Sequence, residues 1–228
     1  KGWHDLRREN EPLGWRESMI NRQPGRPMKA RPRILETACI LFLQQGLDIS
    51  LDEIANEAGT TRQTLYNHFP SKDALVLETF NHLIEKMQPP IAAILAQESM
   101  DLPQVLARFA SVVQAHFFSV DNVHFQRLMV QLLLQKPELY ATLRERNDGR
   151  VLQAFVKMLE QARQHGQVQF ADAQPQAMAF LGAVMGYPLP AALLSDQWPT
   201  PEQLQQMAEA AITAFLLAWR YSPPAITE

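Results

Sequence analysis

Residues 50–75 read SLDEIANEAGTTRQTLYNHFPSKDAL. The stretch begins at Ser50 with the Ser-x-x-Glu spacing of a capping box, in which a hydroxyl and a carboxylate each satisfy a free backbone N–H at the start of a helix. Gly59 is typical of the residue that ends a helix, and Thr60 begins a second capping-box spacing, Thr-x-x-Gln. The pattern therefore predicts a short helix after Ser50 and another at about 62–68, joined by a tight turn.

Each of these two helices is too short to be stable alone, so both must pack against longer neighbours. Before them, apolar residues at three- and four-residue spacing predict a helix from about residue 33 that ends at Gly46. Those apolar residues are Ile34, Leu35, Ala38, Leu41 and Phe42. After them, Ser71 can cap a helix over 72–97, which Pro89-Pro90 should bend or break. This order of helices has the build of a helix-turn-helix unit.

The second short helix has side chains suited to reading DNA. Leu65 and Phe69 are four residues apart and are expected to point inward. The residues left facing outward are Thr61, Arg62, Gln63, Tyr66 and Asn67. Arg paired with guanine, and Gln or Asn paired with adenine, are the commonest contacts to base edges in the major groove. The composition of this helix therefore favours sequence-specific DNA binding.

Over residues 32–78 the chain resembles the DNA-binding domain of TetR-family transcriptional regulators. The resemblance rests on three motifs at fixed offsets: Ala-x-x-Ala-Gly at 55–59, Leu-Tyr-x-His-Phe at 65–69 and Ser-Lys-x-x-Leu at 71–75. Their combination is specific, whereas any one alone would be weak. Gln63 departs from the pattern, because many members have Gly or a small residue there, and this leaves the preferred operator sequence open.

The resemblance implies roles for individual residues. Tyr66 and Lys72 match the phosphate-contacting tyrosine and lysine of the family, and Lys72 would lie in a first helical turn, where free N–H groups also favour phosphate. Arg62, Gln63 and Thr64 match the base-reading positions, and Ser50 would bring the first short helix against the DNA backbone. The complete set of expected DNA-binding residues is Arg26, Lys29, Arg31, Arg33, Ser50, Thr61, Arg62, Gln63, Thr64, Tyr66, Asn67, His68 and Lys72.

Residues 1–31 are expected to form a flexible basic arm, because prolines and glycines interrupt any periodic pattern. Residues 18–35 include five cations and no acidic residue. Within them, Pro-Gly-Arg-Pro at 24–27 is similar to the core of minor-groove AT-hook peptides. The alternative is a solvated basic tail.

The net charge of −3 does not exclude binding to DNA, because Lys+Arg and Asp+Glu balance at 12 each up to residue 89.

The remaining chain is predicted to be helical as well. Amphipathic segments are expected at about 101–118, 121–135, 137–165, 175–195 and from residue 200 onward. No alternating run of β-branched residues is long enough for a sheet. The predicted fold is all-α, with an N-terminal three-helix helix-turn-helix domain at 32–78, a larger helical domain at 79–221 and a tail at 222–228.

The larger domain resembles the regulatory domain of the same family, and its AefR-like branch in particular. That resemblance implies a ligand cavity and dimerisation through the last two helices. The expected dimer residues are Gly182, Gly186, Leu204, Ala208, Ala211, Phe215 and Trp219. The glycines would allow a second helix to approach closely. The alternative for the last-helix stripe is that it covers only the core of its own subunit.

Aromatic and Met residues could line an apolar pocket with adaptable walls. The candidates are Phe109, Phe117, Phe125, Met129, Phe155, Met158 and Tyr187. Such residues at helical spacing are also what an ordinary core contains, and nothing in the sequence names the ligand.

The sequence lacks the motifs of the common enzyme classes, namely a Gly-rich phosphate loop, G-x-S-x-G and H-E-x-x-H. The six histidines show no metal-ligand spacing, and Cys39 on the apolar side of a helix is expected to be packed. We therefore expect no catalytic residue, metal or cofactor. With a single cysteine, no apolar run of membrane-spanning length and no visible secretory signal, a soluble cytoplasmic protein associated with the bacterial nucleoid is expected.

Together these features predict a ligand-responsive, homodimeric transcriptional regulator, in the first place a repressor, that binds a palindromic operator and is released by an apolar or amphipathic effector. An activator, a regulator that senses a protein partner, and a helical enzyme or adaptor without DNA contact remain as alternatives.

Overall fold

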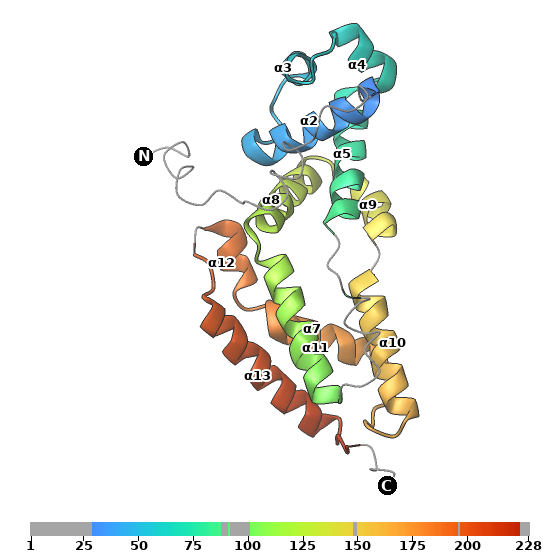
Figure 1. Ribbon diagram of the computed structural model, residues 1–228, viewed down its shortest axis with the longest axis vertical. Coiled ribbons are helices and arrows are strands. Elements are labelled where there is room, and N and C mark those ends of the chain that lie inside the picture. Colours follow the sequence, from blue (N-terminus) through green and yellow to red (C-terminus); the bar gives the residue numbers. More distant parts are fainter. Residues whose placement is uncertain (1–28, 88–90, 92–100, 148–149, 196, 224–228) are drawn as a thin grey trace. The chain divides into compact units, whose positions relative to one another are not determined.

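The computed structural model describes residues 29–87, 91, 101–147, 150–195 and 197–223. Within these ranges every regular element is an α-helix, and the all-α prediction is confirmed (Figure 1). The chain divides into two compact units, Lys1–Leu83 and Ile84–Glu228. The boundary predicted after residue 78 and the observed division both fall within one helix. No described helix is long and apolar enough to cross a membrane.

The described residues of the N-terminal unit form four helices: α2 (Ala30–Gln45), α3 (Leu51–Glu57), α4 (Arg62–His68) and α5 (Lys72–Lys86). The last of these extends beyond Leu83, where this unit ends. The first begins earlier than predicted, at Ala30, so that Arg31 belongs to the helix and not to an arm. Pro32 fits there because the first-turn N–H groups of a helix have no intrahelical partner. The predicted break at Pro89-Pro90 lies outside the described residues.

Side-chain caps fix where the two short helices begin. The hydroxyl of Ser50 accepts a hydrogen bond from the Glu53 N–H at 3.2 Å, as the capping-box spacing predicts. The cap of α4 is one residue later than predicted, because Thr61 and not Thr60 accepts from the Thr64 N–H, at 3.1 Å.

A small apolar core holds these helices together. The fully buried side chains of this unit include Ile34, Ala38, Phe42, Ile54, Leu65, Phe69, Leu75 and Phe80. Burial of one large aliphatic or aromatic side chain contributes about 1.5–3 kcal/mol. Seven-residue helices gain little from their own hydrogen bonds, so this burial stabilises α3 and α4.

Within the described residues, the C-terminal unit includes seven further helices: α7 (Leu102–Phe117), α8 (Val120–Gln135), α9 (Leu139–Asn147), α10 (Arg150–Gln164), α11 (Ala173–Met185), α12 (Leu189–Leu194) and α13 (Pro201–Ala218). Two predicted segments are each divided into two helices. The segment at 137–165 becomes α9 and α10, and the sequence between them, Asp-Gly at 148–149, has low helix propensity. The segment at 175–195 becomes α11 and α12, which are separated at the predicted Tyr-Pro-Leu-Pro irregularity.

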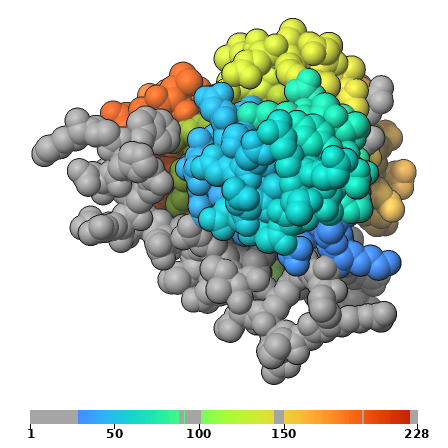
Figure 2. Space-filling model, turned by 90° about the horizontal axis from the view of Figure 1, so that it is seen from above, coloured from blue at the N-terminus to red at the C-terminus, as the bar shows by residue number. Residues whose placement is uncertain are grey.

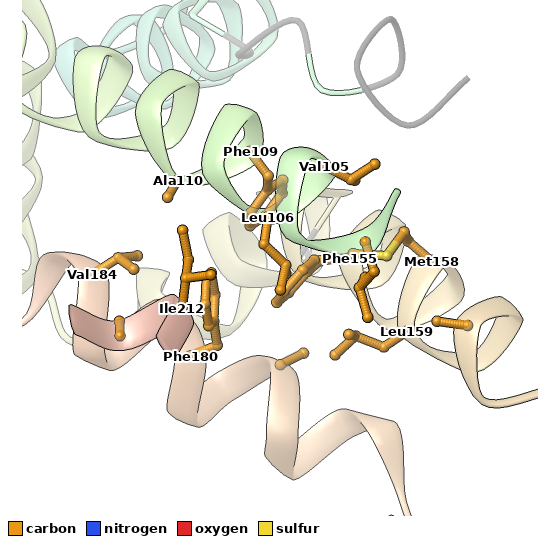
Figure 3. Packing of buried hydrophobic residues seen from close by; sticks show 14 of the residues in the cluster. Val105, Leu106, Phe109, Ala110, Phe155, Met158, Leu159, Phe180, Val184 and Ile212 are labelled. Atoms are coloured by element: carbon orange, nitrogen blue, oxygen red, sulfur yellow. The ribbon is translucent and has the colours of Figure 1, made fainter. Parts of the chain in front are cut away.

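Aromatic side chains of α7, α10 and α11 pack together at the centre of this unit (Figure 3). Phe109 of α7 stacks on Phe155 of α10, with ring centroids 4.2 Å apart. Phe155 in turn contacts Phe180 of α11 at 5.2 Å, and Phe180 lies 6.2 Å from Trp219, which follows α13. The Trp219 indole N–H donates to the Gln176 side chain at 2.8 Å, so its burial leaves no unpaired donor.

A buried amide connects three of these helices. Gln114 of α7 is 4% exposed, and its Nε2 donates to the backbone carbonyls of Val184 in α11 and Leu204 in α13, both at 2.9 Å. The Val184 carbonyl would normally accept from the residue four positions later, but Pro188 has no N–H. The Gln114 side chain therefore supplies the donor that the helix itself lacks.

Replacing Gln114 by Leu is expected to lower the free energy of unfolding by about 1–3 kcal/mol, because a buried carbonyl loses its donor while the side-chain volume stays similar. Denaturant unfolding measures the change. The exposed Gln161 of α10 is a matched control, and Gln161→Leu should change the free energy by no more than about 0.5 kcal/mol. Equal effects of both substitutions would contradict this role for Gln114.

Candidate nucleic-acid interface

The turn between α3 and α4 has a defined hydrogen-bond pattern. Gly59 has φ of +59°, a left-handed conformation that L residues with a Cβ rarely adopt. Its N–H donates to the Asn56 carbonyl at 3.0 Å, and the N–H of Thr60 donates to the Ala55 carbonyl at 2.9 Å. These two bonds form a Schellman motif, which ends α3 and fixes the direction in which α4 begins.

Two arginines predicted to bind DNA have partners within the N-terminal unit. An Nη2 N–H of Arg33 donates to the Gly59 carbonyl at 3.0 Å, which ties α2 to the turn. Arg31 pairs with Glu78 of α5 at 3.1 Å, and its guanidinium carbon lies 5.3 Å from the centre of the Phe69 ring. Both guanidinium groups therefore have partners within the unit that compete with a contact to DNA. Sequence reasoning gave them only a DNA role, because their partners are 26 and 47 residues away in the chain.

The outward face of α4 has the predicted composition. Thr61, Arg62, Gln63, Asn67 and His68 are exposed. Thr64 and Tyr66 are half-buried at its edge, and the inward positions of Leu65 and Phe69 are confirmed by exposures of 0% and 1%. In Figure 2 the surfaces of α3 and α4 form one continuous part of this unit. A polar face with a buried apolar back is what a helix lying in a major groove requires.

Two amide side chains on this face are connected to each other. Nε2 of Gln63 donates to Oδ1 of Asn67 at 3.1 Å, one helical turn away. The bond leaves Oε1 of Gln63 and Nδ2 of Asn67 available to a ligand. The pair thus presents an acceptor and a donor side by side, which matches the edge of a base pair in the major groove.

Arg62, the first residue of α4, has two partners. Its Nη1 donates to Oδ2 of Asp52 in α3 at 2.8 Å, and its Nη2 donates to the Tyr66 hydroxyl at 3.4 Å. The hydrogen bond to Tyr66, with the charge of Asp52, raises the pKa of Arg62 further above its usual range. Because the Tyr66 oxygen accepts from Arg62, its own proton remains free for a phosphate oxygen. Sequence reasoning missed Asp52, since nothing in the spacing shows that it contacts Arg62.

Lys72 is the first residue of α5 and, with Tyr66, one of the two residues expected to contact phosphate. The Ser71 hydroxyl accepts from the Ala74 N–H at 3.1 Å, and Lys72 is half-buried with no ion pair to any described residue. Lys29, which precedes α2, is exposed, whereas Arg26 lies outside the described residues. The described residues also include no group of three or more side chains that could hold a metal ion.

Two family models match the chain in succession. Residues 34–79 match the model described as bacterial regulatory proteins, tetR family. Residues 104–221, more than half of the chain, match the AefR-like transcriptional repressor C-terminal domain. The chain belongs to the TetR family. It is a DNA-binding transcriptional regulator and not an enzyme, and both resemblances inferred from its sequence are confirmed.

Individual relatives agree with this assignment. The HTH-type transcriptional regulator SrpR of Pseudomonas putida is 26% identical over 203 residues, covering 86% of this chain and 87% of SrpR. The repressor KstR2 of Mycolicibacterium smegmatis is 27% identical over 109 residues, covering 47% of this chain and 51% of KstR2. Among solved structures, a TetR-family regulator from Mesorhizobium loti has a TM-score of 0.75 at 23% identity, covering 83% of this chain and 96% of that one. The flavonoid-responsive regulator FrrA has a TM-score of 0.65 at 28% identity, with the same coverage.

Four of the seven predicted pocket residues lie in or against one cluster of this TetR-family chain, and the other three do not belong to it. Phe109, Phe155 and Met158 belong to the central core cluster, and Phe117 packs against it. On α8, Phe125 is buried and Met129 is half-buried. Tyr187 is 91% exposed and lines no interior surface, because it follows α11 at the irregular Tyr-Pro-Leu-Pro turn.

The predicted dimer stripe of α13 belongs to the core of its own chain. Ala208, Ala211 and Trp219 are 7%, 7% and 1% exposed, Phe215 packs against the same cluster and Leu204 is half-buried. Ala208, Ala211 and Trp219 thus lie on the inner face of the helix, as the alternative interpretation expects, whereas Leu204 and Phe215 remain partly exposed. Gly182 of α11 and Gly186, which directly follows this helix, are exposed. A Cβ at Gly186 would lie 2.6 Å from the Gly182 carbonyl oxygen, so the chain itself requires glycine there.

The lysine and the two arginines are expected to differ in how they affect DNA binding. Lys72→Met should make the dependence of affinity on salt shallower, because the slope of log K changes by about 0.9 for each phosphate that is no longer neutralised. Arg31→Met and Arg33→Met should leave the slope unchanged, because both guanidinium groups already have partners within the unit. Titration of a duplex at several salt concentrations measures the slopes. If Arg31→Met reduced the salt slope as much as Lys72→Met does, Arg31 would contact a phosphate after all.

Proposed function

We propose that this TetR-family regulator is a homodimeric repressor of bacterial genes that binds a palindromic operator through α4 and leaves it when a small apolar or amphipathic effector binds. The main support is the face of α4, where Arg62 and the Gln63–Asn67 pair present donors and an acceptor outward while Leu65 and Phe69 are buried. Two such helices in successive major grooves, about 34–36 Å apart, would read two half-sites related by the symmetry of the dimer.

The direction of regulation is proposed from the relatives. The C-terminal match is to a domain described as that of a transcriptional repressor, and KstR2 is itself named a repressor. A protein that covers a major groove at a promoter also blocks access to it without any further contact. Repression is therefore the simpler mechanism for a dimer that places two such helices on a promoter.

The face proposed for dimerisation is the outer side of α11 and α13, two helices that pack side by side. Met178 of α11 and Leu217 of α13 are 56% and 81% exposed, and Tyr187, just after α11, is 91% exposed. Between them Gly182 and the exposed alanines of both helices leave room for close approach, because a Cβ at Gly182 would meet nothing within 4 Å. A second copy would cover these apolar side chains in a four-helix contact with two-fold symmetry.

Effector control is supported by a buried amide on α5. Asn81 is 8% exposed, and neither of its side-chain polar atoms has a hydrogen-bond partner among the described residues. An unsatisfied buried polar group costs about 1–3 kcal/mol, which a polar group of a ligand or a water would recover. The same helix begins with Lys72, so a ligand that shifts α5 would also shift an expected phosphate contact. FrrA, which has the same fold, is described as flavonoid-responsive.

The dimer proposal is tested with two exposed leucines. Leu217→Arg should place an unpaired charge in the proposed interface and shift the protein from dimer to monomer in sedimentation at micromolar concentration. Leu134 of α8 is a matched control, since it is 80% exposed against 81% for Leu217 but lies outside α11 and α13. Leu134→Arg should leave the dimer intact. A wild-type protein that sediments as a monomer, or equal effects of both variants, would contradict the interface.

The regulatory proposal is tested by selecting fragments of bacterial genomic DNA and placing the enriched promoter before a reporter. The wild-type protein should enrich a site with two related half-sites and lower reporter expression. The double variant Tyr66→Ala and Lys72→Ala should lose the site while its helical circular-dichroism spectrum stays unchanged. Raised reporter expression would identify an activator, and a wild type that enriches no fragment would contradict operator binding.

A further inference from the structure

We infer that Asp52 is a specificity-determining residue of the DNA interface, which acts by holding the Arg62 guanidinium toward base edges and away from phosphates. Asp52 itself would contact no base, so it is a positioning residue that acts through Arg62. The inference rests on the proposed reading of DNA by α4. The observation behind it is the 2.8 Å bond between Oδ2 of Asp52, in the first turn of α3, and Nη1 of Arg62, at the start of α4.

This ion pair contributes little to the stability of the fold. The two side chains are 60% and 55% exposed, and ion pairs that water reaches so easily are among the weakest contacts in proteins. The connection between α3 and α4 is instead made by the Schellman motif at Gly59 and by burial of Ile54 and Leu65. The effect of the pair is therefore on where the guanidinium lies.

Arg62 is held from two sides. Its Nη2 donates to the Tyr66 hydroxyl, and its guanidinium carbon lies 5.5 Å from the centre of the Tyr66 ring. With Asp52 on Nη1 and Tyr66 on Nη2, a long and otherwise mobile side chain is restricted to one region, and its remaining N–H donors stay available. A side chain already held in a binding geometry loses less entropy when it binds.

The charge of Asp52 acts in the same direction. Contacts to phosphate depend mainly on net positive charge and are the same for every sequence, whereas a paired contact to guanine depends on the direction of the N–H donors. A carboxylate beside Arg62 offsets its positive charge and repels phosphates, but leaves the donors in place. Asp52 thereby weakens binding to all sequences and preserves the contact that distinguishes one of them.

The chain includes a matched control one residue away. Glu53 lies in the same turn of α3, is exposed, and its side chain has no ion pair with α4 in the described part of the chain. Glu53→Gln removes the same charge at the same end of α3 as Asp52→Asn does. A difference between the two variants therefore comes from the contact with Arg62 and not from the charge of the helix alone.

The experiment selects binders from a library of randomised DNA duplexes with the full-length wild type, Asp52→Asn and Glu53→Gln. Asp52→Asn should keep the same consensus but lose preference at one position in each half-site, with the ratio of specific to non-specific affinity falling about 5- to 100-fold. On random duplex its salt slope should become steeper by about 0.9 per subunit, since a released Arg62 gains a phosphate. Glu53→Gln should retain the wild-type base preference.

Two further variants separate positioning from a structural role. In an Arg62→Ala background, Asp52→Asn should have no further effect on base preference. With Arg62 present, Asp52→Glu, which keeps the carboxylate, should retain most of the preference that Asp52→Asn loses. If the wild type enriches a site and Asp52→Asn enriches it with unchanged base preference, the inference is overturned while the proposed function stands. If the wild type enriches no sequence, the proposed function fails and the inference fails with it.

Discussion

Helix α4, which we propose reads DNA, depends on one backbone constraint, the left-handed turn at Gly59. Helices α3 and α4 have seven residues each and would not persist as isolated peptides. The turn closes α3 with two hydrogen bonds, Thr61 caps α4 within the next two residues, and Arg33 donates to the Gly59 carbonyl from α2. A side chain with a Cβ at Gly59 would strain this conformation although the space around it is open. The geometry of the face proposed to bind DNA follows from this short segment.

Contacts between side chains, more than composition, determine which positive charges of this protein are available to DNA. The net charge is −3, and the DNA-binding half of the chain is balanced. Some of its cations form ion pairs within the unit, as Arg31 does with Glu78, whereas others, such as Lys72, have no such partner and remain available to phosphate. Arg62 is between these cases, because an acidic partner holds it while leaving it exposed. An interface that binds a polyanion and still distinguishes sequences needs this division, since every free cation strengthens binding to all DNA alike.

The C-terminal unit shows a related division between two faces of one helix. The inner face of α13 presents Ala208, Ala211 and Ile212 to the aromatic core, while Leu217 remains 81% exposed on the outer face. Gln114 anchors the start of α13 and the end of α11 to α7 through two carbonyls. The two helices proposed to bind a second copy are thus held by the core of their own subunit. The outer surface that they present is fixed before any partner arrives.

The sequence by itself determined the fold class, the order of the helix-turn-helix and the polar face of α4, because caps, turn glycines and apolar spacing act over a few residues. The inward positions of Leu65 and Phe69 follow directly from the helical period. What only the tertiary structure decided were the contacts between distant residues: Arg33 with Gly59, Arg62 with Asp52, and the core position of the α13 stripe. Periodicity shows that Ala208, Ala211 and Trp219 share a face, but not whether its own chain or a second copy covers that face. That choice depends on how the helices pack in three dimensions, which no local spacing encodes.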